Sequence, residues 1–126
     1  MRVLCALALG VATVALPATA AMAHHSAVAF DRSNPITLTG KVIKFQWANP
    51  HAWIDVAVPD GKGGTDTWRV EGPSVSILAR NDWKRDSIKP GETIRLLVAP
   101  NRDGSNGGEF LVVKKADGTI LKFGII

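Results

Sequence analysis

Residues 38–58 read LTGKVIKFQWANPHAWIDVAV, and this stretch decides the fold. Its apolar residues alternate, but the phase shared by Leu38 and Val42 gives way to the phase shared by Ile43 and Phe45. A change of face in mid-strand is typical of a β-bulge, because one extra residue turns all later side chains to the opposite side. We therefore predict a bulged first strand with the break near Val42-Ile43.

The sequence Asn49-Pro50 ends this strand, and a second alternating strand follows it. One phase of the second strand is entirely apolar and is expected to face the core: Ala52, Ile54, Val56 and Val58. The opposite phase carries His51, Trp53 and Asp55. This second strand is therefore expected to present a chemically mixed face away from the core.

The rest of the chain alternates short strands with polar turns. A turn-rich loop over 59–64 leads into a strand over 67–70, in which Trp68 and Val70 are expected to point inward. Ser74 is expected to cap a short helix over 75–79, and Trp83 to close over the end of that helix. Further strands are expected over 93–98, 110–113 and 120–123.

This order predicts an all-β fold. The expected architecture is a small five- to six-stranded OB-like Greek-key barrel with one short helix between strands 3 and 4. A bulged first strand suits closure of such a barrel. An open β-sandwich is the alternative.

The first 23 residues have the features of a signal peptide. Arg2 precedes an uncharged apolar run over 3–16, Pro17 breaks that run, and Ala21-Met22-Ala23 fits the small-x-small cleavage pattern. The run is shorter than the roughly 20 residues that span a bilayer, so we expect no stable membrane span after cleavage. The predicted organisation is a signal peptide over 1–23, an N-terminal arm over 24–35 and a barrel domain over 36–126, located in the periplasm or secreted.

Cysteine content and charge restrict the chemistry of the mature chain. Cys5, the only cysteine, lies in the predicted leader, so thiolate ligands and disulfides are excluded after cleavage. Removing Arg2 lowers the formal net charge from +4 to +3, and the basic residues form scattered pairs instead of a stripe. Together with export, this leads us to expect no nucleic acid as a partner, and a metal ion, an envelope protein or a small ligand instead.

The chain resembles a family of small secreted bacterial proteins of unknown function. The resemblance rests on Trp47-Ala48-Asn49-Pro50-His51-Ala52-Trp53 beside the start His24-His25-Ser26, and it extends over nearly all of the predicted mature chain. It implies an exported β-barrel and no established activity. The family carries a glycine before the tryptophan at the helix end, whereas this chain has Asn81-Asp82 before Trp83.

The three histidines carry the strongest chemical signal. Cleavage after Ala23 would give His24 a free α-amine that chelates a metal together with its own imidazole, while His25 adds a second imidazole and His51 a third. Such nitrogen ligands suit Cu(II), with Zn and Ni as alternatives, and the sequence suggests no cofactor besides such a metal ion, copper first. The competing interpretation is a solvated terminus, with His51 bonded to the Asn49-Pro50 turn.

A second candidate is a ligand platform formed by Trp53, Asp55 and Trp47, because an exposed indole beside a polar group suits a sugar or peptide. Packing of Trp53 against the helix is the alternative interpretation. The carboxylates Asp31, Asp55, Asp66 and Glu71 show no spacing that forces any two together, and no catalytic motif is present.

The sequence therefore favours a binding module over an enzyme. The leading hypothesis is an exported module that binds copper or another transition metal through His24, His25 and His51. The first alternative is a metal-independent periplasmic module for a peptide, glycan or protein. The second alternative is a copper-dependent redox enzyme.

Overall fold

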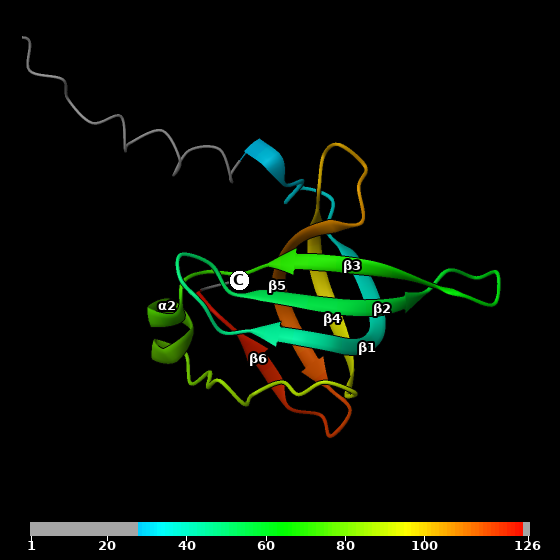
Figure 1. The fold of residues 1–126 in the computed structure, drawn as a ribbon. Coiled ribbons are helices and arrows are strands. Elements are labelled where there is room, and N and C mark those ends of the chain that lie inside the picture. The colour runs from blue at the N-terminus through cyan, green and yellow to red at the C-terminus, as the bar shows by residue number, and fades with distance from the viewer. Residues whose placement is uncertain (1–27, 125–126) are drawn as a thin grey trace, which may run out of the picture.

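A computed structural model describes residues 28–124 of the chain (Figure 1). The predicted leader, His24 and His25 lie outside these residues. The elements in chain order are β1 (Ile36–Gln46), β2 (Trp53–Pro59), β3 (Thr65–Glu71), α2 (Val75–Arg80), β4 (Thr93–Pro100), β5 (Gly107–Lys115) and β6 (Ile120–Lys122). Between residues 28 and 124, no helix has the length and apolar character needed to cross a membrane.

The six strands form one sheet that closes on itself. Their order is β3-β2-β1-β4-β5-β6, with antiparallel neighbours, and an additional parallel pairing joins β3 to β5. That pairing sets Val70 beside Gly108 and Glu71 beside Glu109, so the first five strands close a barrel and β6 extends the sheet from β5. The prediction of an OB-like barrel with its helix between strands 3 and 4 is confirmed, and the open sandwich is excluded.

The predicted bulge lies where the side-chain pattern placed it. Val42 of β1 pairs with Val56 of β2, but the next paired residue is Lys44, opposite Asp55. Ile43 is the extra residue, and its side chain is 48% exposed. The bulge therefore lets one strand contribute Val42 and then Phe45 to the same interior, because the phase of alternation changes between them.

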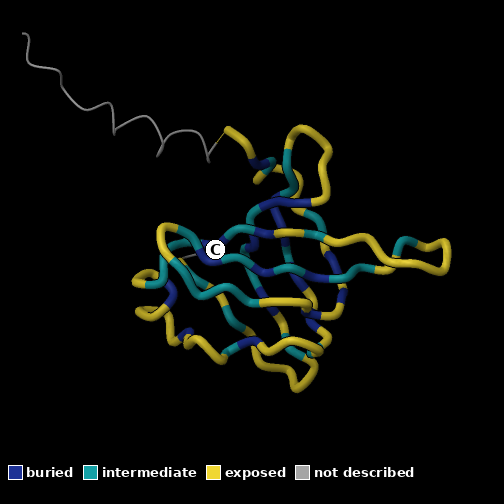
Figure 2. The backbone as a smooth tube through the Cα atoms, in the orientation of Figure 1, coloured by how far each residue is buried: buried dark blue, intermediate teal, exposed yellow. Residues whose placement is uncertain are grey.

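Each of the first five strands carries buried residues, which are dark blue in Figure 2. Three residues of the expected inward set of β2 are completely buried, namely Ala52, Ile54 and Val56, and Val58 is partly buried against them. On β3, Val70 is buried and Trp68 packs against the core. The inward faces of both strands follow the sequence prediction.

Aromatic rings fill the core beside α2. Trp83 is 2% exposed, and its ring centroid lies 5.5 Å from that of Phe110 and 6.1 Å from that of Phe45. Its indole Nε1 donates a hydrogen bond of 3.0 Å to the Lys122 carbonyl oxygen, which joins the helix end to β6. Trp83 thus closes over the end of the helix as predicted.

The start of α2 differs from the prediction. Ser74 occupies the N-cap position, but its side chain makes no capping hydrogen bond and lies 3.0 Å from the Ser76 hydroxyl instead. The Val75 backbone N–H donates a hydrogen bond of 3.1 Å to Asn49 Oδ1. The side chain of Asn49, in the loop between β1 and β2, thus accepts from one of the N–H groups that the first turn of a helix leaves without a partner. At the other end, Asp82 has a φ of 64°, a left-handed conformation that explains why a glycine suits this position.

Candidate functional site

Polar and aromatic side chains gather on the outside of the barrel where β2 lies beside β3. The register pairs Trp53 with Glu71 and Asp55 with Arg69. His51 lies just before β2 and contacts Glu71. We call this group, His51, Trp53, Asp55, Arg69 and Glu71, the β2–β3 outer face. It collects the predicted His51, Trp53 and Asp55 on one surface.

Backbone pairing fixes the position of His51. The Ala52 amide donates to the Pro73 carbonyl at 3.1 Å, and the Gly72 amide donates to the Ala52 carbonyl at 2.8 Å, which extends the β2–β3 ladder beyond both strands. His51 is thereby held beside the Gly72-Pro73 segment. Its side chain is 42% exposed and accessible from solvent.

One ring nitrogen of His51, Nδ1, faces two hydrogen-bond acceptors. Nδ1 lies 2.8 Å from Glu71 Oε1 and 3.1 Å from the Gly72 carbonyl oxygen. A carbonyl oxygen only accepts hydrogen bonds, so Nδ1 carries a proton in this arrangement. The neutral ring then has its lone pair on Nε2, and Nε2 has no hydrogen-bond partner among residues 28–124.

Barrel closure places a second carboxylate and a guanidinium beside this pair. Glu109 of β5 is the parallel partner of Glu71. Arg32 forms a bidentate interaction with Glu109, with Nε 2.7 Å from Oε2 and Nη2 2.8 Å from Oε1. The His51–Glu71 pair and the Arg32–Glu109 pair therefore lie on neighbouring strands, with Glu71 and Glu109 at paired positions.

The segment that carries Arg32 is fastened to the barrel by its backbone as well. Phe30 is 7% exposed and forms an antiparallel bridge with Asn101. The Asp31 amide donates to the Pro100 carbonyl at 2.8 Å, and the Arg102 amide donates to the Ala29 carbonyl at 2.9 Å. The described part of the arm thus lies along the loop between β4 and β5 (Figure 1).

The predicted ligand platform is divided between two places. The Arg69 guanidinium lies over the Trp53 ring, 4.8 Å from its centroid, and 3.6 Å from Asp55 Oδ2. Trp53 therefore stays on the outer face under an arginine and does not pack against the helix. Trp47 lies apart from this face and packs edge-on against Phe45, with 5.9 Å between ring centroids.

Burial raises the pKa of the Glu71 carboxyl; the adjacent His51 opposes this rise and the charge of Glu109 adds to it. The carboxyl is thus harder to ionise in the folded protein than in the unfolded chain. The contribution of the Glu71 carboxyl to the free energy of unfolding is fully present below about pH 4.5, which is its ordinary pKa. This contribution is lost as the pH rises through the higher pKa of the folded state.

We therefore expect Glu71→Gln to change the pH dependence of stability. The glutamine keeps an oxygen acceptor for His51 but does not titrate, so the variant should gain stability relative to the wild type as the pH rises from about 4 to 7. Urea unfolding of both proteins across this range measures the difference. Parallel stability profiles would contradict the assigned role of Glu71.

Sequence patterns identified His51 and missed the groups that orient it. Glu71 was recognised only as an unpaired carboxylate, while Glu109 and Arg32 were not singled out. The parallel pairing of β3 with β5 brings these groups together, and no local spacing reports that pairing.

Within residues 28–124, no three His, Cys, Asp or Glu side chains are arranged to hold a metal ion. A metal at His51 would therefore need ligands from outside this range.

The chain matches one family model and is similar to a solved structure. A family model described as a family of unknown function, DUF6152, matches residues 11–110. No curated protein matches the chain. Among solved structures, the chain is similar to the mitochondrial single-stranded DNA-binding protein Rim1 from S. cerevisiae, with 13% identity and a TM-score of 0.45. The similarity covers 72% of this chain and 97% of that chain.

This last comparison corrects one expectation. Nucleic acid was excluded as a partner because the basic residues are scattered and the chain has a predicted leader. A similar solved chain is a single-stranded DNA-binding protein, so that exclusion was wrong and is withdrawn. At this identity and TM-score the likeness concerns the fold, and it does not identify what this chain binds.

Proposed function

The chain belongs to DUF6152, a family of unknown function, and we propose that it is an exported module that binds a transition-metal ion, Cu(II) above others. The proposed ligands are His24, His25 and Nε2 of His51. Export rests on the leader pattern of residues 1–23. Cleavage after Ala23 makes His24 the first residue of the mature chain.

The orientation of His51 is the observation that carries this proposal. Metal-binding histidines almost always donate their second ring N–H to a carboxylate or a backbone carbonyl, which fixes the ring and makes the free nitrogen more basic. His51 has both kinds of partner on Nδ1, at 2.8 Å from Glu71 and 3.1 Å from Gly72. Its Nε2 is thereby prepared to act as a ligand.

The anchored arm supplies the remaining ligands. Arg32 is fixed to Glu109, which is the neighbour of the carboxylate that holds His51. Arg32 lies seven positions after His25, and a segment of this length spans at most about 25 Å when extended. Arg32 therefore fixes the arm beside the strand pair that carries Glu71 and Glu109.

The ligand chemistry favours copper. An α-amine and imidazoles form a nitrogen-rich set that suits the tetragonal coordination of Cu(II), which also stands highest in the divalent affinity order. An α-amine with an ordinary pKa of about 7.7 to 8.0 is readily deprotonated by a metal near neutral pH. The Glu71 carboxylate adds negative charge beside the His51 ring. Zn and Ni are the competing metals for the same set.

The metal-independent alternative relies on Trp53 as a stacking platform. Arg69 already lies over that ring at 4.8 Å, so a sugar or aromatic ligand would have to displace the guanidinium from this side or use the other. His51 requires no such displacement. The structure therefore supports metal binding better than recognition through Trp53.

We expect His51→Ala to weaken Cu(II) binding by the exported, processed protein about tenfold or more, because it removes one of three imidazoles. Isothermal titration against a competing chelator measures the change. Asp66→Asn is a matched control, since it alters an exposed side chain near the other end of β3 and should leave affinity unchanged. Wild-type affinity in His51→Ala would remove His51 from the site, and the absence of binding by the wild type would overturn the proposed function.

A further inference from the structure

A second surface of the barrel, formed by strands other than β2 and β3, is basic. It lies on the outer sides of β1, β4, β5 and β6. We call its four cationic side chains the basic face: Lys41, Arg95, Lys114 and Lys122. All four residues are exposed, and each comes from a different strand.

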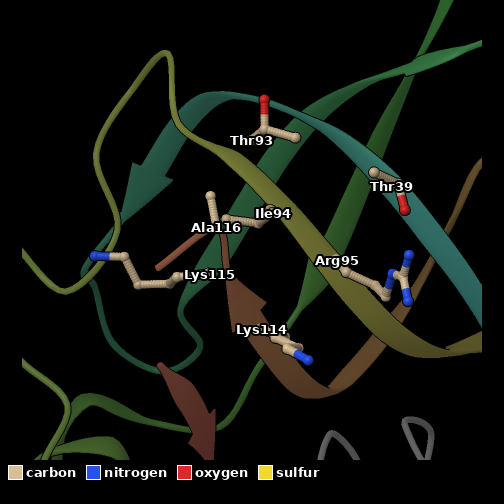
Figure 3. Close-up of a pocket in the computed structure, with 7 residues that line it drawn as sticks. All are labelled: Thr39, Thr93, Ile94, Arg95, Lys114, Lys115 and Ala116. Carbon is tan, nitrogen blue, oxygen red and sulfur yellow. The ribbon is translucent and has the colours of Figure 1, made fainter. Parts of the chain in front are cut away.

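Strand register places Arg95 beside Lys114, and it places Lys41 and Lys122 two positions along β1 and β6 from the residues paired with these two. Arg95 of β4 pairs with Thr39 of β1 on one side and with Lys114 of β5 on the other. Lys114 in turn pairs with Ile120 of β6. Figure 3 shows Arg95 and Lys114 on neighbouring strands, with Lys115 projecting away from them. Because cross-strand neighbours lie about 5 Å apart, residues that look scattered in the sequence form one cationic surface.

The charge of the basic face is not neutralised locally. None of its four cations forms an ion pair with another residue in the part of the chain that the structure describes. The neighbouring Lys115 differs, because its Nζ lies 3.4 Å from Glu92 Oε1 and 2.9 Å from the Ser87 carbonyl oxygen. The paired positions between these cations carry threonines and aliphatic residues instead of carboxylates.

Shallow depressions separate the cations. One has a volume of about 220 Å³ and lies between Arg95 and Lys114, with aliphatic side chains of Leu97, Val112 and Ile120 in its lining. Ile120 is 58% exposed. A second depression of about 260 Å³ adjoins it and is the one drawn in Figure 3. The surface thus alternates positive charge with accessible aliphatic groups.

We propose that the basic face docks on an anionic phospholipid membrane. Lysine and arginine near such a surface are attracted to its phosphates, and aliphatic side chains can enter the boundary between headgroups and acyl chains. A single-stranded nucleic acid would share the charge complementarity, but its bases stack on aromatic rings. The depressions are lined by threonine, lysine, arginine and aliphatic residues only, which favours lipid on this face.

Vesicle cosedimentation tests this inference on the exported, processed protein, with cleavage verified by intact mass. Binding is expected to vesicles of equal parts phosphatidylglycerol and phosphatidylcholine and not to pure phosphatidylcholine. Raising the salt from about 0.05 to 0.5 M should weaken binding severalfold, because exposed charges are screened. Arg95→Gln with Lys114→Gln should weaken it about tenfold or more.

The matched control is Arg80→Gln with Lys84→Gln, which removes the same two side-chain types from exposed positions at the end of α2 and just after it. Its vesicle binding should stay within about twofold of the wild type. The inference is overturned if anionic vesicles do not bind, if the control loses binding equally, or if an oligothymidylate binds this face in preference to vesicles. The variant with Arg95→Gln and Lys114→Gln should bind copper with the affinity of the wild type. A failure of the membrane proposal can therefore be told apart from a failure of the metal proposal.

Discussion

Trp83→Ala should lower the free energy of unfolding by about 3 to 5 kcal/mol, the usual range for removing a buried tryptophan. Its side chain is 2% exposed and contacts the rings of Phe45 and Phe110. The substitution also leaves the Lys122 carbonyl without its indole donor. Since small domains are stable by only about 5 to 15 kcal/mol, we expect a large fall in the urea midpoint.

Trp53→Ala is the control for this prediction. It removes the same side chain from the outer face of β2, where the ring is half-buried beneath Arg69, and should cost about 1 kcal/mol. Urea unfolding followed by circular dichroism compares the two variants without relying on tryptophan emission. Equal losses would show that Trp83 does not organise the core as described.

Gly108→Ala should destabilise the barrel by about 3 kcal/mol, because closure leaves no room for a side chain there. Gly108 pairs with Pro100 of β4 and with Val70 of β3, so β5 is enclosed on both sides at this point. An added Cβ would overlap the Ala99 carbonyl oxygen and lie 2.6 Å from Val98 Cγ1. Backbone in neighbouring strands has to move to accept it.

Gly64→Ala is the control for Gly108→Ala. Its Cβ would meet only the carboxylate of Asp60, 2.8 Å away, and this flexible side chain can shift. The cost should stay within about 1 kcal/mol. Chemical denaturation of both alanine variants measures the difference, and a Gly108→Ala protein as stable as Gly64→Ala would contradict the tight β3–β5 closure.

The strands and their inward faces could be predicted because alternation is a local property. The phase change at Val42-Ile43 located the bulge, and the apolar phase of β2 identified Ile54 and Val56 as core. Barrel topology followed from the number of strands and the single helix between β3 and β4. For the strands and the bulge, the physical cause acts over a few neighbouring residues.

The contacts that define the candidate site could not be predicted in the same way. Glu71 and Glu109 are adjacent only because β3 and β5 pair in parallel across the barrel closure. Asn49, 26 positions before Val75, takes over the capping role predicted for Ser74. These pairings depend on tertiary structure, so local sequence showed His51 as a candidate ligand but not the carboxylate that orients it.

The basic face also depends on tertiary structure, so local sequence did not predict it. Its cations occupy separate strands, and their sequence spacing suggested isolated, solvated pairs. Cross-strand register converts them into one surface, since Arg95 lies directly opposite Lys114. Charge clustering on a barrel is therefore a property of register, and composition alone does not reveal it.

Pulsed electron paramagnetic resonance of the processed protein with one equivalent of Cu(II) tests the proposed site most directly, because it detects the remote nitrogen of each coordinated imidazole. We predict that His51→Ala lowers the number of coordinated imidazoles by one, since the Nδ1 contact with Glu71 leaves Nε2 as the ligand atom. An identical spectrum in the wild type and in His51→Ala would contradict the account.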